Sequence, residues 1–214
     1  MNRRQFVGQM AASAALAYGG SAAATVMKSG VTNTPDGPRP VLRAYVVQPE
    51  RVVQDCPNWC WAASCAMIFA MYQHPTDQLQ IVDKVFGKLQ CQGANQLVMQ
   101  DVLSASWRDK LGNDFGSRVT ARYAPASGIV SINKALIVEL LTDNKPILYA
   151  NTHHAMVIVS ADYVETDSGP NVMSLGVLDP WPASQPYHPL TPAEMIPIHQ
   201  GGQMTFLASV DIAR

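Results

Sequence analysis

The stretch Gln54-Asp-Cys-Pro-Asn-Trp-Cys60-Trp61-Ala62-Ala63 carries the strongest signal in this chain. A glutamine stands six residues before a cysteine, and that cysteine opens an apolar run that continues to Tyr72. Apolar residues recur at helical spacing and cover nearly the whole circumference, which predicts a buried central helix. Cys60 would begin this helix, where the helix dipole favours a thiolate. Cys65 would lie mid-helix as a small buried residue.

Two later segments supply partners for such a thiol. His154-Ala-Met-Val-Ile-Val begins an apolar strand, and Val177-Leu-Asp179-Pro-Trp181 ends another. We expect His154 to accept the thiol proton and Asp179 to orient the imidazole. Gln54 and the backbone N–H of Cys60 would donate to a developing oxyanion.

Each of these residues has an ordinary interpretation when taken alone. His154 would be a polar residue at the start of a strand, and Asp179 would form a turn before Pro180, with Trp181 packed nearby. A single glutamine means little, so the weight of Gln54 comes from its interval to Cys60. The combination of thiol, imidazole, carboxylate and amide favours nucleophilic catalysis by cysteine, with Trp181 shielding the His–Asp hydrogen bond from water.

The adjacent His153 competes with His154 for the same role. Neighbours on a strand face opposite sides, so only one of them would face Cys60. We choose His154 because an alanine and then the apolar run follow it directly. The remaining histidines lie among loop residues and are expected at the surface: His74, His188 and His199.

The composition bounds the class of protein. The chain has 214 residues, of which 48% are hydrophobic and 14% charged, and its formal net charge is −1. This length suits one domain, and no apolar run reaches the ~18 residues of a spanning helix, so we expect no membrane span in the mature protein. The charge gives no reason to expect nucleic acid as a partner. No feature calls for a cofactor.

The N-terminus resembles an export signal. Met1-Asn-Arg3-Arg4-Gln-Phe6 precedes an Ala-rich stretch that ends in Ala22-Ala23-Ala24. This predicts a twin-arginine-like signal peptide over residues 1–24, with an ordinary secretory signal as the alternative. A flexible leader over residues 25–40 and one domain over residues 41–214 would follow. We therefore expect a periplasmic or secreted bacterial protein.

The four cysteines fit an exported protein better than a metal site. Disulfides persist outside the cytoplasm. If Cys60 is a free nucleophile, Cys56, Cys65 and Cys91 form at most one bridge. The spacings between the cysteines do not match a zinc knuckle, and no histidine pair follows, so we expect no metal.

Periodicity and breakers predict helices first and strands later. This order is typical of an α+β fold. Helices are expected over residues 60–72, 76–86, 95–107 and 131–142. Strands are expected over residues 41–47, 119–123, 147–150, 155–161, 172–178 and 204–212.

Together, the Gln-x5-Cys60-Trp61 segment, the His154-Ala pair and Asp179-Pro-Trp181 resemble the papain-like cysteine peptidases. The shorter bacterial branches look most similar, namely the bacteriocin-leader peptidases and the effector-type papain-like proteases. The chain departs from the plant and lysosomal pattern in two places. Cys56 lies four residues before Cys60 rather than three, and Asp179 stands where asparagine is more familiar.

The resemblance implies a fold and an activity. The helix of the cysteine would belong to an N-terminal helical half, packed on a C-terminal antiparallel β-sheet or half-barrel with a cleft between them. A disulfide between Cys56 and Cys91 is favoured over one between Cys65 and Cys91. The implied activity is that of an exported cysteine endopeptidase, which cleaves a peptide or protein substrate through a thioester.

Two alternatives stay open on the same fold. One is a cell-wall peptide amidase or an amine-acceptor transferase, and the other is a non-catalytic papain-like binding module. The sequence carries no indication of an oligomeric state.

Overall fold

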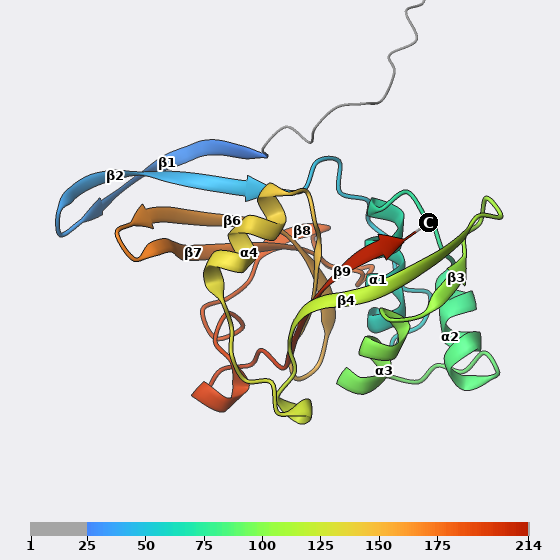
Figure 1. Cartoon of the computed structure of the whole chain (residues 1–214). Coiled ribbons are helices and arrows are strands. Elements are labelled where there is room, and N and C mark those ends of the chain that lie inside the picture. Colours follow the sequence, from blue (N-terminus) through green and yellow to red (C-terminus); the bar gives the residue numbers. More distant parts are fainter. Residues whose placement is uncertain (1–24, 214) are drawn as a thin grey trace, which may run out of the picture.

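A computed structural model describes residues 25–213 of the chain, so the expected signal peptide lies outside the described residues. Within this range, four α-helices pack on an antiparallel sheet of nine strands (Figure 1). The helices are α1 (Cys60–Met71), α2 (Gln78–Phe86), α3 (Gln96–Val102) and α4 (Lys134–Thr142). The strands are β1 (Val26–Thr34), β2 (Gly37–Tyr45), β3 (Ser106–Arg108), β4 (Asp114–Tyr123), β5 (Ile147–Ala150), β6 (Ala155–Thr166), β7 (Gly169–Leu178), β8 (Tyr187–Pro189) and β9 (Phe206–Ala213).

Strand β6 is the centre of the sheet. The strands follow the order β1-β2-β6-β5-β9-β4-β3, and β7 joins β6 to β8. The first part of β6 pairs with β5 and the next part with β2, while β7 pairs along nearly its whole length. The continuous apolar run after His154 is buried, as expected of a strand covered on both faces.

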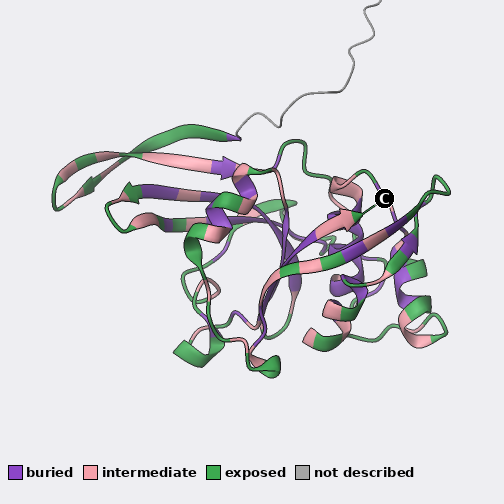
Figure 2. Cartoon of the chain, in the orientation of Figure 1, coloured by how far each residue is buried: buried purple, intermediate pink, exposed green. Residues whose placement is uncertain are grey.

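Helix α1 forms the core of the helical half. Every residue from Trp61 to Phe69 is buried, so the nearly all-round apolar pattern does correspond to a central helix. α1 packs on β6 and β5 and is flanked by α2 and α3. Figure 2 shows this burial concentrated along α1 and the strands it crosses. The α+β arrangement expected from the sequence, with the helix of the cysteine packed on an antiparallel sheet, is confirmed.

Residues 25–40 do not form the flexible leader expected from their prolines and glycines. They belong to a β-hairpin of β1 and β2, which turns at Gly37 with φ 109°. β2 joins the main sheet only through Leu42–Tyr45, which pairs with β6. Pro38 and Pro40 lie in the part of β2 that pairs with β1 alone, where a strand tolerates a missing N–H donor.

The first described residue ties this hairpin to the rest of the domain. The hydroxyl of Thr25 donates to the carbonyl oxygen of Leu141 at 2.8 Å, at the C-terminal end of α4. Its carbonyl oxygen accepts the backbone N–H of Tyr45 at 3.0 Å. The folded domain therefore begins well before residue 41.

Helix boundaries differ from the sequence expectation where a capping residue lies elsewhere. α2 is capped by Asp77 rather than Thr76, because the Asp77 carboxylate accepts the backbone N–H of Leu79. Gly87 ends α2 in the left-handed conformation, as its position predicts. α3 stops at Val102, well short of the expected residue 107, because Trp107 is drawn into β3 and buried beside β4.

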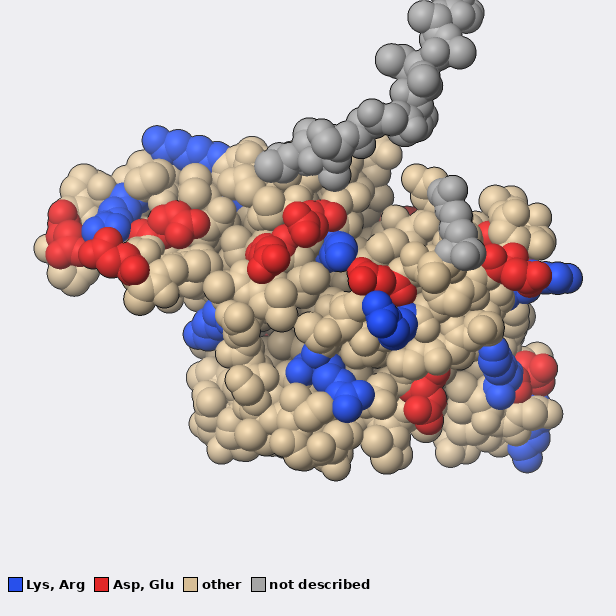
Figure 3. Space-filling model, in the orientation of Figure 1, with Lys and Arg blue, Asp and Glu red and all other residues tan. Residues whose placement is uncertain are grey.

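No helix between residues 25 and 213 is both long enough and apolar enough to cross a bilayer. On the face drawn in Figure 3, lysine and arginine side chains are scattered among aspartate and glutamate.

Candidate active site

Cys60 and His154 line one pocket where the helical half meets the sheet. The pocket has a volume of about 300 Å³. One wall comes from the loop that leads into Cys60 (residues 54–60, the Cys60 loop) and from the segment before α3. The other wall comes from the turn between β5 and β6. Its further lining residues include Asn58, Gly93, Asn95, Asn151 and His153. A thiol and an imidazole therefore share a cavity open to solvent.

Cys60 is the first residue of α1. The residue is partly exposed, whereas Cys65 one turn later is fully buried. Trp59 makes no side-chain capping bond to the first turn, and that turn contains no acidic residue. The positive end of the helix dipole therefore acts on the Cys60 sulfur. Burial and the nearby Cys60 raise the pKa of Cys65 well above its usual range, so that thiol stays protonated.

His154 is paired with Asp179. Its Nε2 lies 2.6 Å from Oδ1 of Asp179, which leaves Nδ1 as the ring nitrogen available to the thiol. Burial opposes protonation of the ring. Hydrogen bonds to Asp179 and to Cys60, with the charges of both groups, outweigh it and raise the pKa of His154 to about 9. An imidazolium beside the thiol is the partner that stabilises a thiolate.

Asp179 lies at the end of β7 and is nearly buried. Burial alone would raise its pKa, but hydrogen bonds from His154 and from the backbone N–H of Trp181, with the charge of His154, hold the pKa well below its usual range. The Trp181 N–H donates to Oδ1 at 2.8 Å. A carboxylate that stays ionised can keep the imidazole in one orientation.

Arg51 secures the turn that carries Asp179. Its guanidinium donates to the carbonyl oxygen of Asp179 at 2.7 Å and to that of Trp181 at 2.6 Å. The backbone N–H of Gln54 donates to the carbonyl oxygen of Pro180 at 2.9 Å. The segment before the cysteine and the turn after β7 are thus bound to each other.

His154 and His153 both lie in the turn before β6 rather than on the strand. Alternation along a strand therefore does not separate them, and His153 is exposed and lines the same pocket. Asn151 forms this turn, since its side-chain oxygen accepts the backbone N–H groups of His153 at 2.8 Å and of His154 at 2.7 Å. Of the two histidines, His154 is the one that contacts Asp179.

Gln54 lies beside the site but points its amide group into its own loop. The side-chain nitrogen donates to the carbonyl oxygens of Cys56 at 2.8 Å and of Pro57 at 2.9 Å. Its Oε1 is buried and has no partner among the described residues. Both amide hydrogens therefore already face acceptors in this structure, and the role of Gln54 as an oxyanion donor stays a prediction.

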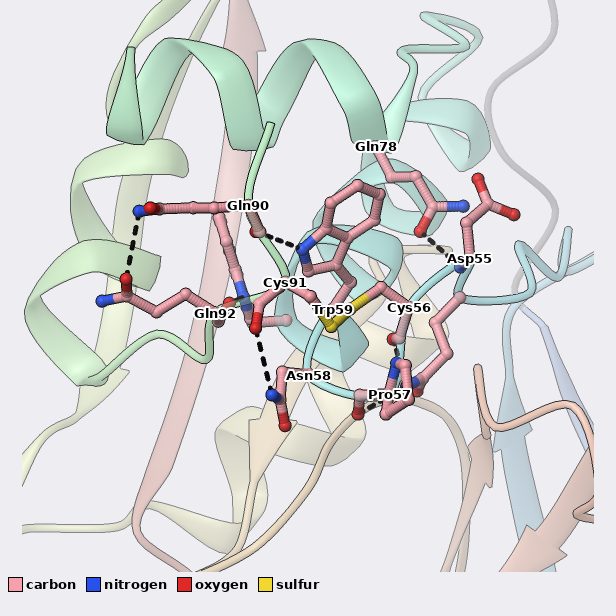
Figure 4. The surroundings of a disulfide bond; sticks show 11 residues. Asp55, Cys56, Pro57, Asn58, Trp59, Gln78, Gln90, Cys91 and Gln92 are labelled. Atoms are coloured by element: carbon pink, nitrogen blue, oxygen red, sulfur yellow. Dashed lines mark hydrogen bonds between the residues drawn. A yellow bond between two sulfur atoms is a disulfide. The ribbon is translucent and has the colours of Figure 1, made fainter. Parts of the chain in front are cut away.

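A disulfide joins Cys56 and Cys91, which is the pairing favoured from the resemblance. Their Cα atoms lie 5.9 Å apart, a normal span for this bond. Figure 4 shows that Asn58 and Trp59 reinforce it by donating to the carbonyl oxygens of Cys91 and Gln90. The Cys60 loop is thereby fastened to the segment that leads to the pocket wall.

The two tryptophans of the motifs differ in their surroundings. Trp61 is buried, donates its indole N–H to the carbonyl oxygen of Gln92, and meets Phe86 edge-on. Trp181 is 40% exposed and lines a small hollow together with Gln54 and Pro57. The main chain of Trp181 contacts Asp179 directly, because its N–H donates to Oδ1.

Of the histidines expected at the surface, His74 is buried, and His188 is partly exposed but contacts Asp179. His74 is buried against Phe115 and pairs with Asp109 at 3.0 Å. His188, on β8, places Nε2 3.3 Å from Oδ2 of Asp179. Arg51 and Asn151 were likewise not singled out from the sequence. An asparagine between a strand and the His153–His154 pair is a turn signal that could have identified Asn151.

Comparison with known families agrees with this geometry. The model of the Peptidase_C39-like family matches residues 44–194, which is more than half of the chain. The chain belongs to the Peptidase_C39-like family. It is therefore a papain-like cysteine peptidase, as the motifs around Cys60, His154 and Asp179 suggested.

No curated protein sequence matches the chain. Among solved structures, the chain is similar to the peptidase domain of Streptococcus ComA, described as a bifunctional ABC transporter involved in a quorum-sensing pathway. The two are 14% identical, with a TM-score of 0.43, and the match covers 78% of this chain and 98% of that domain.

Proposed function

We propose that this Peptidase_C39-like protein is an exported endopeptidase that cleaves peptide bonds through Cys60, His154 and Asp179. The observation that carries the proposal is the 2.6 Å contact between His154 Nε2 and Asp179 Oδ1 beside a pocket that also holds Cys60. The raised pKa of His154, to which Cys60 contributes, supports a thiolate–imidazolium pair.

The reaction would proceed through a thioester. The Cys60 thiolate attacks the carbonyl carbon of the scissile bond, and the negative charge that develops on the oxygen is bound by the Cys60 backbone N–H. The His154 imidazolium donates its proton to the leaving amine. The neutral imidazole then takes a proton from water, and the resulting hydroxide hydrolyses the thioester to release the acid.

Gln54 is the proposed second oxyanion donor, and its present contacts set a condition for that role. Its amide nitrogen must exchange one of the carbonyl oxygens of Cys56 and Pro57 for the oxyanion. The hydrogen bond from the backbone N–H of Gln54 to Pro180 keeps the buried Gln54 side chain next to the turn of Asp179–Trp181. A side-chain rotation during the reaction would complete the exchange.

We also propose that the protein works in the periplasm or outside the cell. The disulfide between Cys56 and Cys91 supports this location, because such bonds are rare in reducing compartments. The Arg3-Arg4 pair and the Ala-rich stretch after it provide the matching export signal.

A labelling experiment on the mature protein tests the proposed chemistry. An epoxysuccinyl inhibitor should label the protein once, at Cys60, and labelling should be lost in His154→Ala. Cleavage of a peptide library should be lost in Cys60→Ala while the melting temperature is retained. A Cys60→Ala variant that still cleaves peptides would refute the assignment.

A further inference from the structure

His188 contacts the one carboxylate oxygen of Asp179 that His154 does not use. Oδ1 accepts from His154 Nε2 at 2.6 Å and from the Trp181 N–H at 2.8 Å. Oδ2 lies 3.3 Å from Nε2 of His188. The side chain of Asp179 is only 8% exposed, so its two oxygens depend on protein donors. Each oxygen of the Asp179 carboxylate thus contacts an imidazole.

We propose that His188 is a positioning residue of this peptidase, which holds Oδ2 of Asp179 and thereby keeps Oδ1 directed at His154. The inference rests on the proposed function, since it assigns His188 a role in orienting the imidazole that activates Cys60. A carboxylate bonded through one oxygen alone can rotate about its Cβ–Cγ bond. A second donor on the other oxygen removes that freedom.

The pairing of strand β8 with β7 places His188 beside Asp179. It pairs with β7 so that His188 lies opposite Val177, two residues before Asp179. Tyr187 fixes one side of the strand, because its hydroxyl lies 2.8 Å from that of Ser160. The backbone N–H of Leu190 donates to the carbonyl oxygen of Leu175 at 2.8 Å and fixes the other side. His188 is therefore held by the sheet rather than by a free loop.

The other groups around Asp179 do not replace His188. Arg51 donates to the main-chain carbonyl of Asp179 and makes its bonds away from the carboxylate. Ser184 also lowers the pKa of Asp179 through its hydroxyl, which donates to the carbonyl oxygen of Trp181 at 2.8 Å. His188 is the side chain whose ring nitrogen lies against Oδ2 among the described residues.

Both ring nitrogens of His188 face acceptors. Nδ1 lies 3.1 Å from the carbonyl oxygen of Pro189, and Nε2 lies 3.3 Å from Oδ2 of Asp179. An ionised carboxylate can only accept, so a hydrogen on Nε2 is the form in which His188 contributes a hydrogen bond to Asp179.

Two variants of matched size separate a hydrogen-bonding role from a packing role. His188→Gln keeps an N–H donor near the position of Nε2, whereas His188→Met fills similar space without a donor. His199→Ala serves as a control, because His199 contacts Tyr123 and lies outside the proposed site. Thermal melting of each variant verifies that it is folded.

The measurement is the rate of Cys60 alkylation by iodoacetamide as a function of pH, with mass spectrometry to locate the label. It needs no peptide substrate. We expect His188→Met to slow alkylation at neutral pH about ten-fold, as the loss of one charge-assisted hydrogen bond predicts. His188→Gln should alkylate within about two-fold of the wild type, since its donor is retained. With a peptide substrate, the loss should appear in kcat rather than in KM.

Two results would overturn the proposal, and only the second would also overturn the proposed function. If His188→Met and His188→Gln alkylate alike, hydrogen bonding by His188 does not position Asp179, while the proposed function stands. If Cys60 in the wild type already titrates as an ordinary thiol, the proposed function fails and this inference fails with it.

Discussion

Asn151 holds His154 by its backbone on two sides. The side-chain oxygen of Asn151 accepts the N–H of His154 at 2.7 Å, and the Asn151 N–H donates to the carbonyl oxygen of His154 at 2.9 Å. The side-chain nitrogen of Asn151 in turn donates to Glu194 at 3.0 Å. The turn that places the imidazole is therefore anchored to a segment far along the chain.

Asn151→Ala should impair this turn. We expect a loss of about 1–2 kcal/mol in the free energy of unfolding, since the variant removes two hydrogen bonds that Asn151 accepts and one that it donates. Activity on a peptide substrate should fall about ten-fold at a temperature where both proteins are folded, because the imidazole loses its fixed position. Chemical denaturation and initial rates measure the two effects. An unchanged rate would show that the turn is held without Asn151.

The two adjacent histidines should differ sharply in their effect on activity. His154→Ala should lower kcat/KM by about 10³-fold or more, since the residue is both the proton acceptor and the donor to the leaving amine. His153→Ala should change it by less than about ten-fold, because His153 lines the pocket without contacting Asp179. Steady-state kinetics on one fluorogenic peptide compare them. The opposite ranking would transfer the role to His153.

The high pKa of His154 predicts how activity changes with pH. The active form needs the imidazolium, so kcat/KM should fall as pH rises through about 9, the pKa of His154. In Asp179→Asn this basic limb should move down towards the ordinary histidine value of 6.5, because the main charge that raises the pKa is gone. Rates measured from pH 5 to 10 test the shift. Identical basic limbs in the two proteins would contradict it.

The same pair predicts a pH dependence of stability. The folded pKa of His154 is raised, so its stabilising contribution is complete below about pH 6.5 and is lost as pH rises through about 9. The folded pKa of Asp179 is lowered, so its contribution is present above its ordinary value of 3.8 and is lost as pH falls below it. Melting temperatures of the wild type and Asp179→Asn should therefore differ most between these limits and converge outside them.

Gln54 should matter for the Cys60 loop as well as for the reaction. Gln54→Ala removes two hydrogen bonds to the carbonyl oxygens of Cys56 and Pro57, and we expect a loss of about 1–3 kcal/mol in stability. Gln54→Glu should destabilise more, because a carboxylate would face both carbonyl oxygens without a donor. If Gln54 also binds the oxyanion, kcat falls about 100-fold in the folded Ala variant. Unchanged stability in Gln54→Glu would contradict the loop role.

Breaking the disulfide should loosen the pocket wall. Cys56 and Cys91 are 35 residues apart in sequence, and a closed loop of this length predicts a loss of about 3–4 kcal/mol when both are changed to serine. Denaturation with and without a reducing agent measures the loss. The reductant should destabilise the wild type and leave the double variant unaffected. Equal effects on both proteins would show that another bond is being reduced.

The residues with chemical roles could be predicted where each stands in a local pattern. Cys60 opens an apolar helix, His154 precedes an apolar strand, and Asp179 follows one. Arg51 and His188 could not be predicted in this way, because each acts through residues brought close only by the fold. Their neighbours in sequence show no periodicity that would single them out.

The helices and strands also divide into those that a local pattern could predict and those that it could not. Elements with a continuous apolar run were predictable to within a few residues, as the four-residue strand β5 and the twelve-residue helix α1 illustrate. The three-residue strands β3 and β8 were not, because they are too short for a pattern and are defined by their partners. The strand expected over residues 41–47 overlaps the end of β2, but the rest of the hairpin of β1 and β2 was missed, since its prolines and glycines are typical of loops.

The distance along the chain between Cys60 and His154 has a consequence for synthesis. The two residues come to line one pocket only when α1 packs on β5 and β6, so the proposed nucleophile and its imidazole partner are brought together only in the folded domain. The proposed cleavage would therefore begin only once the domain is complete. Labelling of this single sulfur atom by the epoxysuccinyl inhibitor would then report, in a cell extract, what fraction of the molecules has reached the native state.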